Sequence, residues 1–204
     1  MAYGIILLPA DPGPLTRLSA ETARLGDPIM RLGAGAPPHV SVVHAEVSAE
    51  TAMALWTELT AHHRMDLALR FAGLMFAPIA PGDPYVPEGG VYCGLECVRS
   101  AALLELHEAA RSWLDAAQAP MLSPSGTRFR PHLTLNVLRA APSGAVPLPG
   151  PLFGTDMRFR AALGRLGPYG TFPEIVATVQ PGAAPQDQAG RAGWASGCSS
   201  HHSP

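Results

Sequence analysis

The stretches Pro38-His39-Val40-Ser41-Val42 and Pro131-His132-Leu133-Thr134-Leu135 are one five-residue pattern that occurs twice in the chain. In each copy a proline and a histidine are followed by an apolar residue, a hydroxyl residue and a second apolar residue. This alternation predicts a β-strand, on which the histidine and the hydroxyl share one face. Two such strands side by side would present two imidazoles and two hydroxyls to one point, an arrangement suited to acid–base chemistry on a phosphate ester.

The remainder of the chain predicts a mixed α+β domain around these two strands. Short apolar runs predict further strands, and apolar stripes at helical spacing predict three helices, two of which follow the N-cap residues Ser48 and Ser100. Strands are expected over residues 3–9, 39–47, 66–79, 90–98, 130–138, 157–166 and 172–180, and helices over residues 15–25, 49–63 and 101–117. Each half of the chain then contributes one histidine motif, as an internal duplication would produce.

The composition is that of a folded protein of low net charge. A formal charge of -2 and a hydrophobic content of 47% argue against a disordered or strongly basic chain, so we expect no binding to duplex DNA through bulk charge. All 14 basic residues are arginine, which excludes a Schiff-base enzyme, a nucleotidyl-lysine ligase and a P-loop lysine, and suggests a GC-rich bacterial genome. We expect one domain over residues 1–181 and a disordered tail over residues 182–204, where small and polar residues dominate without periodicity.

The cysteines and the N-terminus favour a reducing compartment. Cys93 and Cys97 fall on one face of a predicted strand, where we expect small buried side chains, and Cys198 lies in the tail. An odd cysteine count, with no basic and apolar leader over residues 1–10, is typical of the cytosol. No apolar run approaches the length of a membrane span. We therefore expect a cytoplasmic protein without a membrane partner, and a monomer.

The paired motifs resemble the H-x-[ST]-x motifs of the 2H phosphoesterase superfamily, which includes 2′-5′ RNA ligase-like proteins and cyclic nucleotide phosphodiesterases. The resemblance covers about residues 3–180. It implies an α+β fold of two pseudo-symmetric lobes, built of mainly antiparallel sheet plus helices around a central cleft, with one motif from each lobe lining the cleft. It also implies cofactor-free and metal-independent action on 2′,3′-cyclic phosphates, related cyclic phosphodiesters or 2′-5′ linkages of small nucleotides or RNA ends.

The same resemblance assigns roles to four residues. His39 and His132 become the catalytic acid–base pair, and Ser41 and Thr134 become hydroxyls that touch the phosphate. Opening a cyclic phosphodiester requires a base to activate water and an acid to protonate the departing ribose oxygen. Histidine, with an ordinary pKa of about 6.5, can fill either role, so the motifs alone leave open which ring is the acid and whether a 2′- or a 3′-phosphate is released.

Two further residues are candidates for substrate binding. Arg130 precedes His132 by two positions and shares its strand face, within residues 121–165, where six arginines accompany one acidic residue. Such a local excess of positive charge favours an anionic ligand. Tyr169 lies in a predicted turn, where it could stack on a base or simply pack against the protein. Many relatives carry an arginine soon after the second motif, whereas here Arg139 comes seven residues after the histidine.

The other histidines are expected to be structural or solvated. His44 lies an odd number of residues from His39, so on a regular strand it points the opposite way. The same expectation holds for His62, His63, His107, His201 and His202. Three alternatives stay open: RNA 2′-5′ joining by the same site, a nucleotide-binding module without catalysis, and a histidine metal site. No Asp or Glu accompanies either motif at ligand spacing, so we expect no metal.

Overall fold

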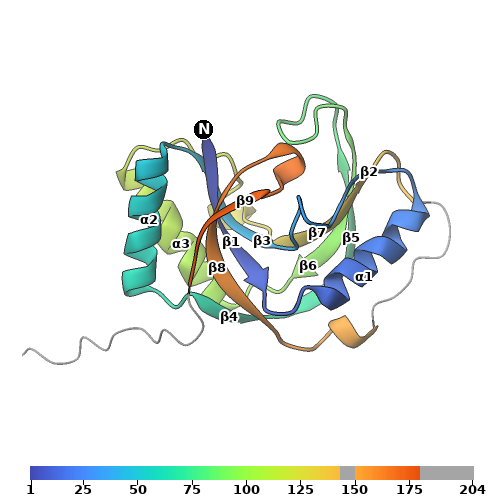
Figure 1. The fold of residues 1–204 in the computed structure, drawn as a ribbon, viewed down its shortest axis with the longest axis horizontal. Coiled ribbons are helices and arrows are strands. Elements are labelled where there is room, and N and C mark those ends of the chain that lie inside the picture. The colour runs from blue at the N-terminus through green and yellow to red at the C-terminus, as the bar shows by residue number, and fades with distance from the viewer. Residues whose placement is uncertain (143–149, 180–204) are drawn as a thin grey trace, which may run out of the picture.

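The two histidine motifs lie on neighbouring strands in the middle of one curved sheet (Figure 1). The computed structural model describes residues 1–142 and 150–179, and these residues form nine strands, all paired antiparallel. Along the sheet the order is β4 (Asp66–Leu69), β8 (Met157–Arg165), β1 (Ala2–Pro9), β3 (Val40–Glu46), β7 (His132–Leu138), β6 (Gly90–Cys97) and β5 (Phe71–Ile79). In addition β2 (Pro28–Arg31) pairs with β7, and β9 (Glu174–Thr178) pairs with β8. The predicted α+β class with a mainly antiparallel sheet is confirmed.

The sheet consists of two groups of strands that meet between β3 and β7, where Val40 lies opposite Leu133. We call the group β4-β8-β1-β3 with β9 the first lobe, and the group β7-β6-β5 with β2 the second lobe. Only Arg70 separates β4 from β5 along the chain, so the two ends of the sheet come together and the sheet must curl. The predicted single strand over residues 66–79 is therefore two strands, which belong to different lobes.

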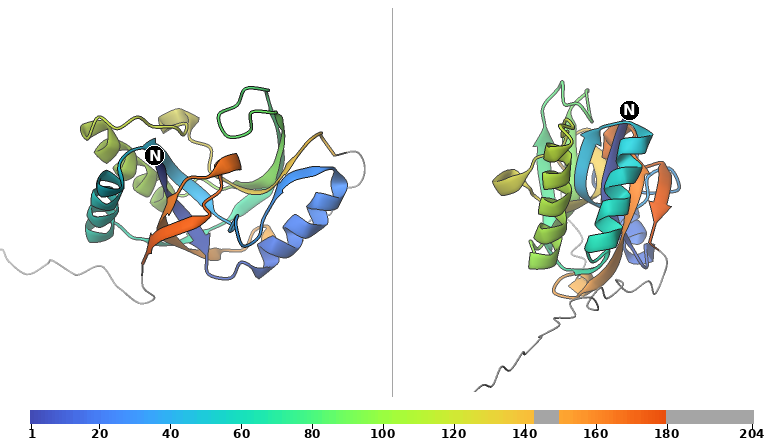
Figure 2. Two further views of the ribbon diagram at one scale, coloured as in Figure 1. Left: turned by 45° about the horizontal axis from the view of Figure 1, so that its top comes forward. Right: turned by 90° about the vertical axis from the view of Figure 1, so that its left-hand side faces the viewer.

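Among the described residues three α-helices cover the sheet: α1 (Gly13–Thr22), α2 (Ala49–His62) and α3 (Ala101–Ala116). The predicted caps are present, because Ser48 Oγ accepts from Thr51 N at 3.0 Å and Ser100 Oγ accepts from Leu103 N at 3.4 Å. Figure 2 shows α2 and α3 side by side against the first lobe, with α1 at the other end of the molecule. The helices are exchanged between lobes: α1 precedes β3 but packs on β7, whereas α3 precedes β7 but packs on β3.

The core explains the apolar run at the start of the chain. β1 lies between β3 and β8 and is buried on both faces. Ile5 and Leu7 join the main core with α2 and α3, while Ile6 faces the other way against Phe172. The free thiols of Cys93 and Cys97 are buried, as expected from the sequence, whereas Cys198 and the predicted tail over residues 182–204 lie outside the described residues.

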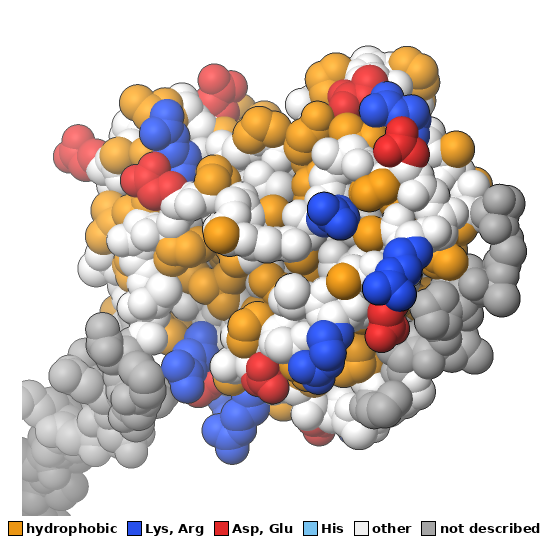
Figure 3. All heavy atoms as spheres, turned by 45° about the vertical axis from the view of Figure 1, so that its right-hand side comes forward, with side chains coloured by type: hydrophobic (Ala, Val, Ile, Leu, Met, Phe, Trp, Pro, Cys, Tyr) orange, Lys and Arg blue, Asp and Glu red, His pale blue; other side chains and the backbone are white. Residues whose placement is uncertain are grey.

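Neither positive nor negative side chains dominate the face of the molecule that Figure 3 shows. On the face in Figure 3, arginine and acidic side chains lie interspersed among apolar ones. Several arginines are paired with acids from distant parts of the chain, such as Arg70 with Asp156 at 3.0 Å. Within residues 1–142 and 150–179, no helix has the length and apolar character needed to cross a membrane.

Candidate active site

Both motif strands carry a β-bulge at the same position, the third residue after the histidine. The extra residue is Val42 in β3 and Leu135 in β7. The pairs on either side are Ile5–Val43 and Ile6–Ser41 in one ladder, and Cys93–Asn136 and Gly94–Thr134 in the other. The internal repeat therefore extends beyond five similar residues to a shared irregularity of the backbone, which supports the predicted pseudo-symmetry of the lobes.

Each bulge is held by a side chain from the exchanged helix. The carbonyl of Val42 accepts a hydrogen bond from Nδ1 of His107 on α3 at 2.8 Å, and the carbonyl of Leu135 accepts one from Oγ of Ser19 on α1 at 2.8 Å. A bulge leaves backbone groups outside the regular ladder, and a buried carbonyl without a partner is costly. His107 is thus structural, as the sequence indicated, and its ring stacks on Phe129 with centroids 3.7 Å apart.

The bulge changes which residues face the cleft. One inserted residue reverses the alternation, so the position five residues after each histidine returns to the face of that histidine. In β3 this residue is His44, which lines the same cavity as His39. In β7 it is Val137, which is fully buried against the wall of that cavity. The expectation that His44 points away from His39 was wrong, because it assumed a regular strand.

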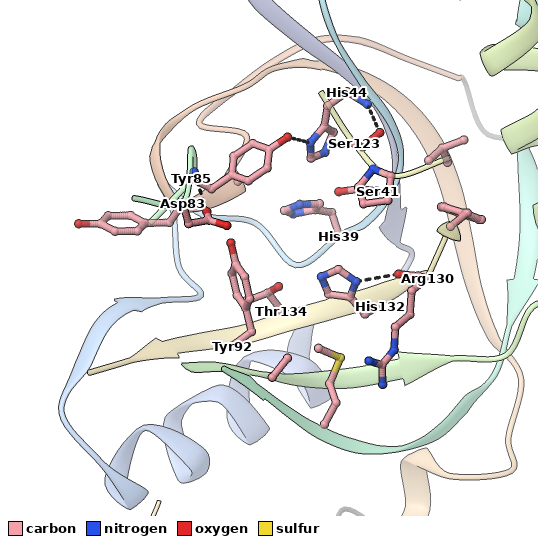
Figure 4. Close-up of a pocket in the computed structure, with 17 residues that line it drawn as sticks. His39, Ser41, His44, Asp83, Tyr85, Tyr92, Ser123, Arg130, His132 and Thr134 are labelled. Carbon is pink, nitrogen blue, oxygen red and sulfur yellow. Dashed lines mark hydrogen bonds between the residues drawn. The ribbon is translucent and has the colours of Figure 1, made fainter. Parts of the chain in front are cut away.

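The two motifs share one cavity of about 310 Å³, near the lower limit of about 300–1,000 Å³ for small-molecule sites (Figure 4). The six residues singled out from the sequence all line it: His39, Ser41, Arg130, His132, Thr134 and Tyr169. Ser41 projects into it from β3 and His39 from the residue just before β3, while His132 and Thr134 project into it from β7. The other lining residues are Val42, His44, Met75, Ala77, Asp83, Tyr85, Tyr92, Ser123, Pro124, Phe129 and Gly170.

The two central imidazoles are oriented in the same way. Nδ1 of His39 lies 2.9 Å from the carbonyl oxygen of Pro37, and Nδ1 of His132 lies 2.9 Å from that of Arg130. In both cases the carbonyl belongs to the residue two positions earlier, across a proline whose φ is fixed by its ring. Because a carbonyl only accepts, Nδ1 carries the proton in both rings. Nε2 of His132 is left to accept from, or donate to, a ligand, whereas His39 has a further hydrogen-bond interaction with the backbone of Gly170.

Burial lowers the pKa of both imidazoles and so favours their neutral forms. Desolvation lowers the pKa of His39 to about 4, and a positive charge on His132 would lower it further, against the opposing effect of the Pro37 carbonyl. Desolvation is also the main cause that lowers the pKa of His132. An anionic ligand beside Nε2 would favour the protonated form of either ring. The pair can therefore offer one basic nitrogen and, once an anion is bound, one acidic N–H.

His44 is a third cavity histidine that sequence reasoning did not select. Its Nδ1 lies 3.0 Å from the hydroxyl oxygen of Tyr85, and that hydroxyl donates to the carbonyl of Leu122 at 3.3 Å. Nδ1–H is therefore the donor to Tyr85, and the buried Nε2 of His44 has no hydrogen-bond partner among the described residues. Desolvation lowers the pKa of His44 to about 3. The ring is neutral and fixed, so it shapes the cavity beside His39.

The arginine excess over residues 121–165 is partly offset by acids from elsewhere, which pair with three of its six arginines. Arg130 donates from Nε to Glu96 at 3.1 Å, Arg139 donates to Asp27 at 2.9 Å, and Arg165 lies 3.6 Å from Glu174. Arg130 is the one arginine among the described residues that line the cavity, where it adjoins His132. Arg139 does not line it. No group of three or more His, Cys, Asp or Glu side chains able to hold a metal ion occurs in the part of the chain that the structure describes.

Comparison with known proteins identifies the fold. No protein-family model and no curated protein matches the chain. Among solved structures, TT0787 of Thermus thermophilus matches with a TM-score of 0.56 and 19% identity, over 87% of this chain and 96% of that chain. A phosphoesterase matches with a TM-score of 0.53 and 16% identity, over 87% and 95%. E. coli LigT complexed with 3′-AMP matches with a TM-score of 0.52 and 16% identity, over 88% and 97%. The chain thus has the LigT-like α+β fold of these structures, as the resemblance of the paired motifs implied.

Proposed function

We propose that this protein is a 2H phosphoesterase that opens 2′,3′-cyclic phosphates, or related cyclic or 2′-5′ phosphodiesters, of nucleotides or RNA ends without a metal. The observation that carries the proposal is the pair of equivalent imidazoles, His39 and His132, that converge on one cavity with identical Nδ1 hydrogen bonds. The fold match to a phosphoesterase, and to E. coli LigT structures complexed with 3′-AMP and with ATP, supports a nucleotide substrate.

In the proposed reaction the two histidines act on opposite sides of the phosphorus. His39, whose pKa is lowered to about 4, is the base that accepts a proton from the attacking water. The water oxygen bonds to phosphorus as the bond to one ribose oxygen breaks, and His132 donates its Nε2 proton to that oxygen. The products are a ring-opened phosphate monoester and two imidazoles that exchange protons with solvent to restore the starting state.

The remaining cavity residues would stabilise the charge that develops on the phosphoryl oxygens. Ser41 and Thr134 lie on the same strand faces as the histidines and can donate from their hydroxyls. Arg130 adds a permanent positive charge next to His132, in spite of its exposed ion pair with Glu96. Donors fixed in advance around a partly buried phosphate require little reorganisation during the reaction.

The function is tested by offering the four 2′,3′-cyclic nucleotides to the purified protein in the presence of EDTA. We expect conversion to 2′- or 3′-monophosphates, which chromatography and phosphorus NMR detect and distinguish. Binding without conversion would favour the nucleotide-binding module instead. Conversion that requires an added divalent cation would favour the metal-site alternative.

The pH dependence of kcat/KM should follow the two lowered pKa values of the free enzyme. Below about pH 4 the base His39 becomes protonated, and the rate falls. As pH rises through the pKa of His132, which lies below the ordinary value of 6.5, the acid loses its proton, and the rate falls again. We therefore expect a bell-shaped profile with its maximum below pH 6.5. If His132 is the base and His39 the acid, the profile is bell-shaped in the same way. A kcat/KM that increases steadily to pH 8 would contradict the proposal.

A further inference from the structure

The cavity carries opposite charges at its two ends. Figure 4 shows Arg130 beside His132 on one side and Asp83 on the other side, beyond His39. Apart from the histidines, Asp83 and Arg130 are the charged side chains among the described residues that line the cavity. The arginine end suits a phosphate. The aspartate end suits the opposite chemistry, a group that donates hydrogen bonds, so the two ends favour a ligand with an anion at one end and donors at the other.

Asp83 is held in place with one carboxylate oxygen left over. Its Oδ1 accepts from the backbone N–H groups of Tyr85 at 2.8 Å and Val86 at 3.0 Å, within the loop between β5 and β6. Val86 is fully buried and anchors that loop. Oδ2 has no hydrogen-bond partner among the described residues, and the carboxylate points into the cavity between Tyr85 and Tyr92 (Figure 4).

Hydrogen bonds to the other lobe fix this loop across the cleft. The carbonyl of Tyr85 accepts from the backbone N–H of Tyr169 at 3.0 Å, and the hydroxyl of Tyr169 donates to Glu88 at 3.1 Å. The hydroxyl of Tyr85 reaches His44 and the carbonyl of Leu122. Because both lobes hold it, the end of the cavity at Asp83 is preorganised, and a ligand loses little entropy in ordering it.

Two tyrosines give this end of the cavity flat apolar walls and a neutral hydroxyl. Desolvation raises the pKa of Tyr85 to about 12 and raises that of Tyr92 as well, and the charge of Asp83 adds to both effects. Both hydroxyls therefore keep their protons near neutrality. Aromatic faces favour stacking with a planar ring, and the Tyr92 hydroxyl beside Asp83 can donate to a carbonyl on that ring.

We propose that Asp83, Tyr85 and Tyr92 form a nucleobase subsite that selects a base with N–H donors on its edge, guanine above all. This inference rests on the proposed function. Guanine presents two adjacent donors, N1–H and the N2 amino group, next to the O6 acceptor, which complements a carboxylate oxygen beside a tyrosine hydroxyl. Adenine and cytosine present one amino group each. Uracil presents one N–H between two carbonyl oxygens, which the carboxylate repels.

The test compares 2′,3′-cyclic GMP with 2′,3′-cyclic UMP as substrates of the wild type and of Asp83→Asn. A hydrogen bond to a charged group is worth about 1.5–3 kcal/mol, so we expect wild-type kcat/KM to favour the guanosine compound by about 10–100-fold. Asparagine keeps the Oδ1 acceptor that the loop needs but replaces Oδ2 with an amide donor. The preference should fall to about threefold or less, or reverse, because the variant loses activity on the guanosine compound and no longer repels the carbonyl oxygens of uracil. Asp66→Asn, on the exposed face of β4, is the matched control and should change nothing.

The outcomes separate this subsite from the proposed function. If the wild type opens all four cyclic nucleotides equally well, or if Asp83→Asn keeps the guanosine preference, the subsite is wrong and the phosphoesterase stands. If no cyclic nucleotide is opened, the proposed opening of cyclic nucleotides is wrong, and calorimetric binding of 3′-GMP and 3′-UMP to both proteins tests the subsite directly. Tighter binding of 3′-GMP that is lost in the variant supports it, whereas equal affinities or an unchanged difference overturn it.

Discussion

Alanine in place of either His39 or His132 is expected to lower kcat/KM for a 2′,3′-cyclic nucleotide by about 10²–10⁴-fold, the usual contribution of one general acid or base. Neither ring can stand in for the other, because each Nδ1 is committed to the carbonyl of the residue two positions earlier in its own segment. His44 cannot replace them either, since its Nδ1 bonds to Tyr85 and its pKa is lowered to about 3. Steady-state kinetics at the pH of maximal rate measures the loss.

The double variant gives a sharper result than either single one. Two groups that transfer protons in the same step act as a unit, so His39→Ala with His132→Ala should fall little below the worse single variant. His62→Ala is the matched control, because this histidine lies on the exposed end of α2 and its side chain is 58% accessible. A folded single variant that keeps wild-type kcat/KM would show that the two-histidine reaction is wrong.

Local sequence signals were sufficient for the elements that place the histidines. A strict alternation over five residues predicted both motif strands, and the N-cap serines Ser48 and Ser100 marked the starts of α2 and α3. The apolar run of β1 predicted a strand that is buried on both faces. These features depend on neighbours within a few residues, which one sequence displays directly.

Features set by long-range pairing could not be predicted in this way. The bulge that turns His44 into the cavity is a property of the ladder between β1 and β3, not of the motif itself. The ion pair between Arg139 and Asp27 joins residues far apart along the chain, so the sequence did not indicate it. In the sequence, the loop over residues 80–89 was marked only by its prolines and glycines. Asp83 becomes a candidate binding residue only in the folded protein, where Tyr92 and the other lobe lie around it. The short strand β2 was not predicted at all, since its pairing partner is β7.

The place where the lobes meet should be the most sensitive part of the core, and Leu133→Ala is expected to lower the free energy of unfolding by about 2–5 kcal/mol. Leu133 is fully buried, lies opposite Val40 across β3 and β7, and pairs with Leu95 of β6 on its other side. Its removal leaves a cavity that cannot readily close, because β7 is paired with β3 on one side and with β6 on the other. Urea denaturation of the variant and the wild type measures the difference.

Met53→Ala on α2 is the control for this prediction, because its side chain is partly exposed and alanine is a good helix former. Its effect should stay within about 0.5 kcal/mol, as for most surface substitutions. The comparison also bears on function, since Leu133 follows His132 directly on β7 and helps to fix the spacing of the two motif strands. If Leu133→Ala lowers the free energy of unfolding by less than about 1 kcal/mol, packing elsewhere sets this spacing. The elements to test would then be the exchanged helices α1 and α3, which hold the two bulges.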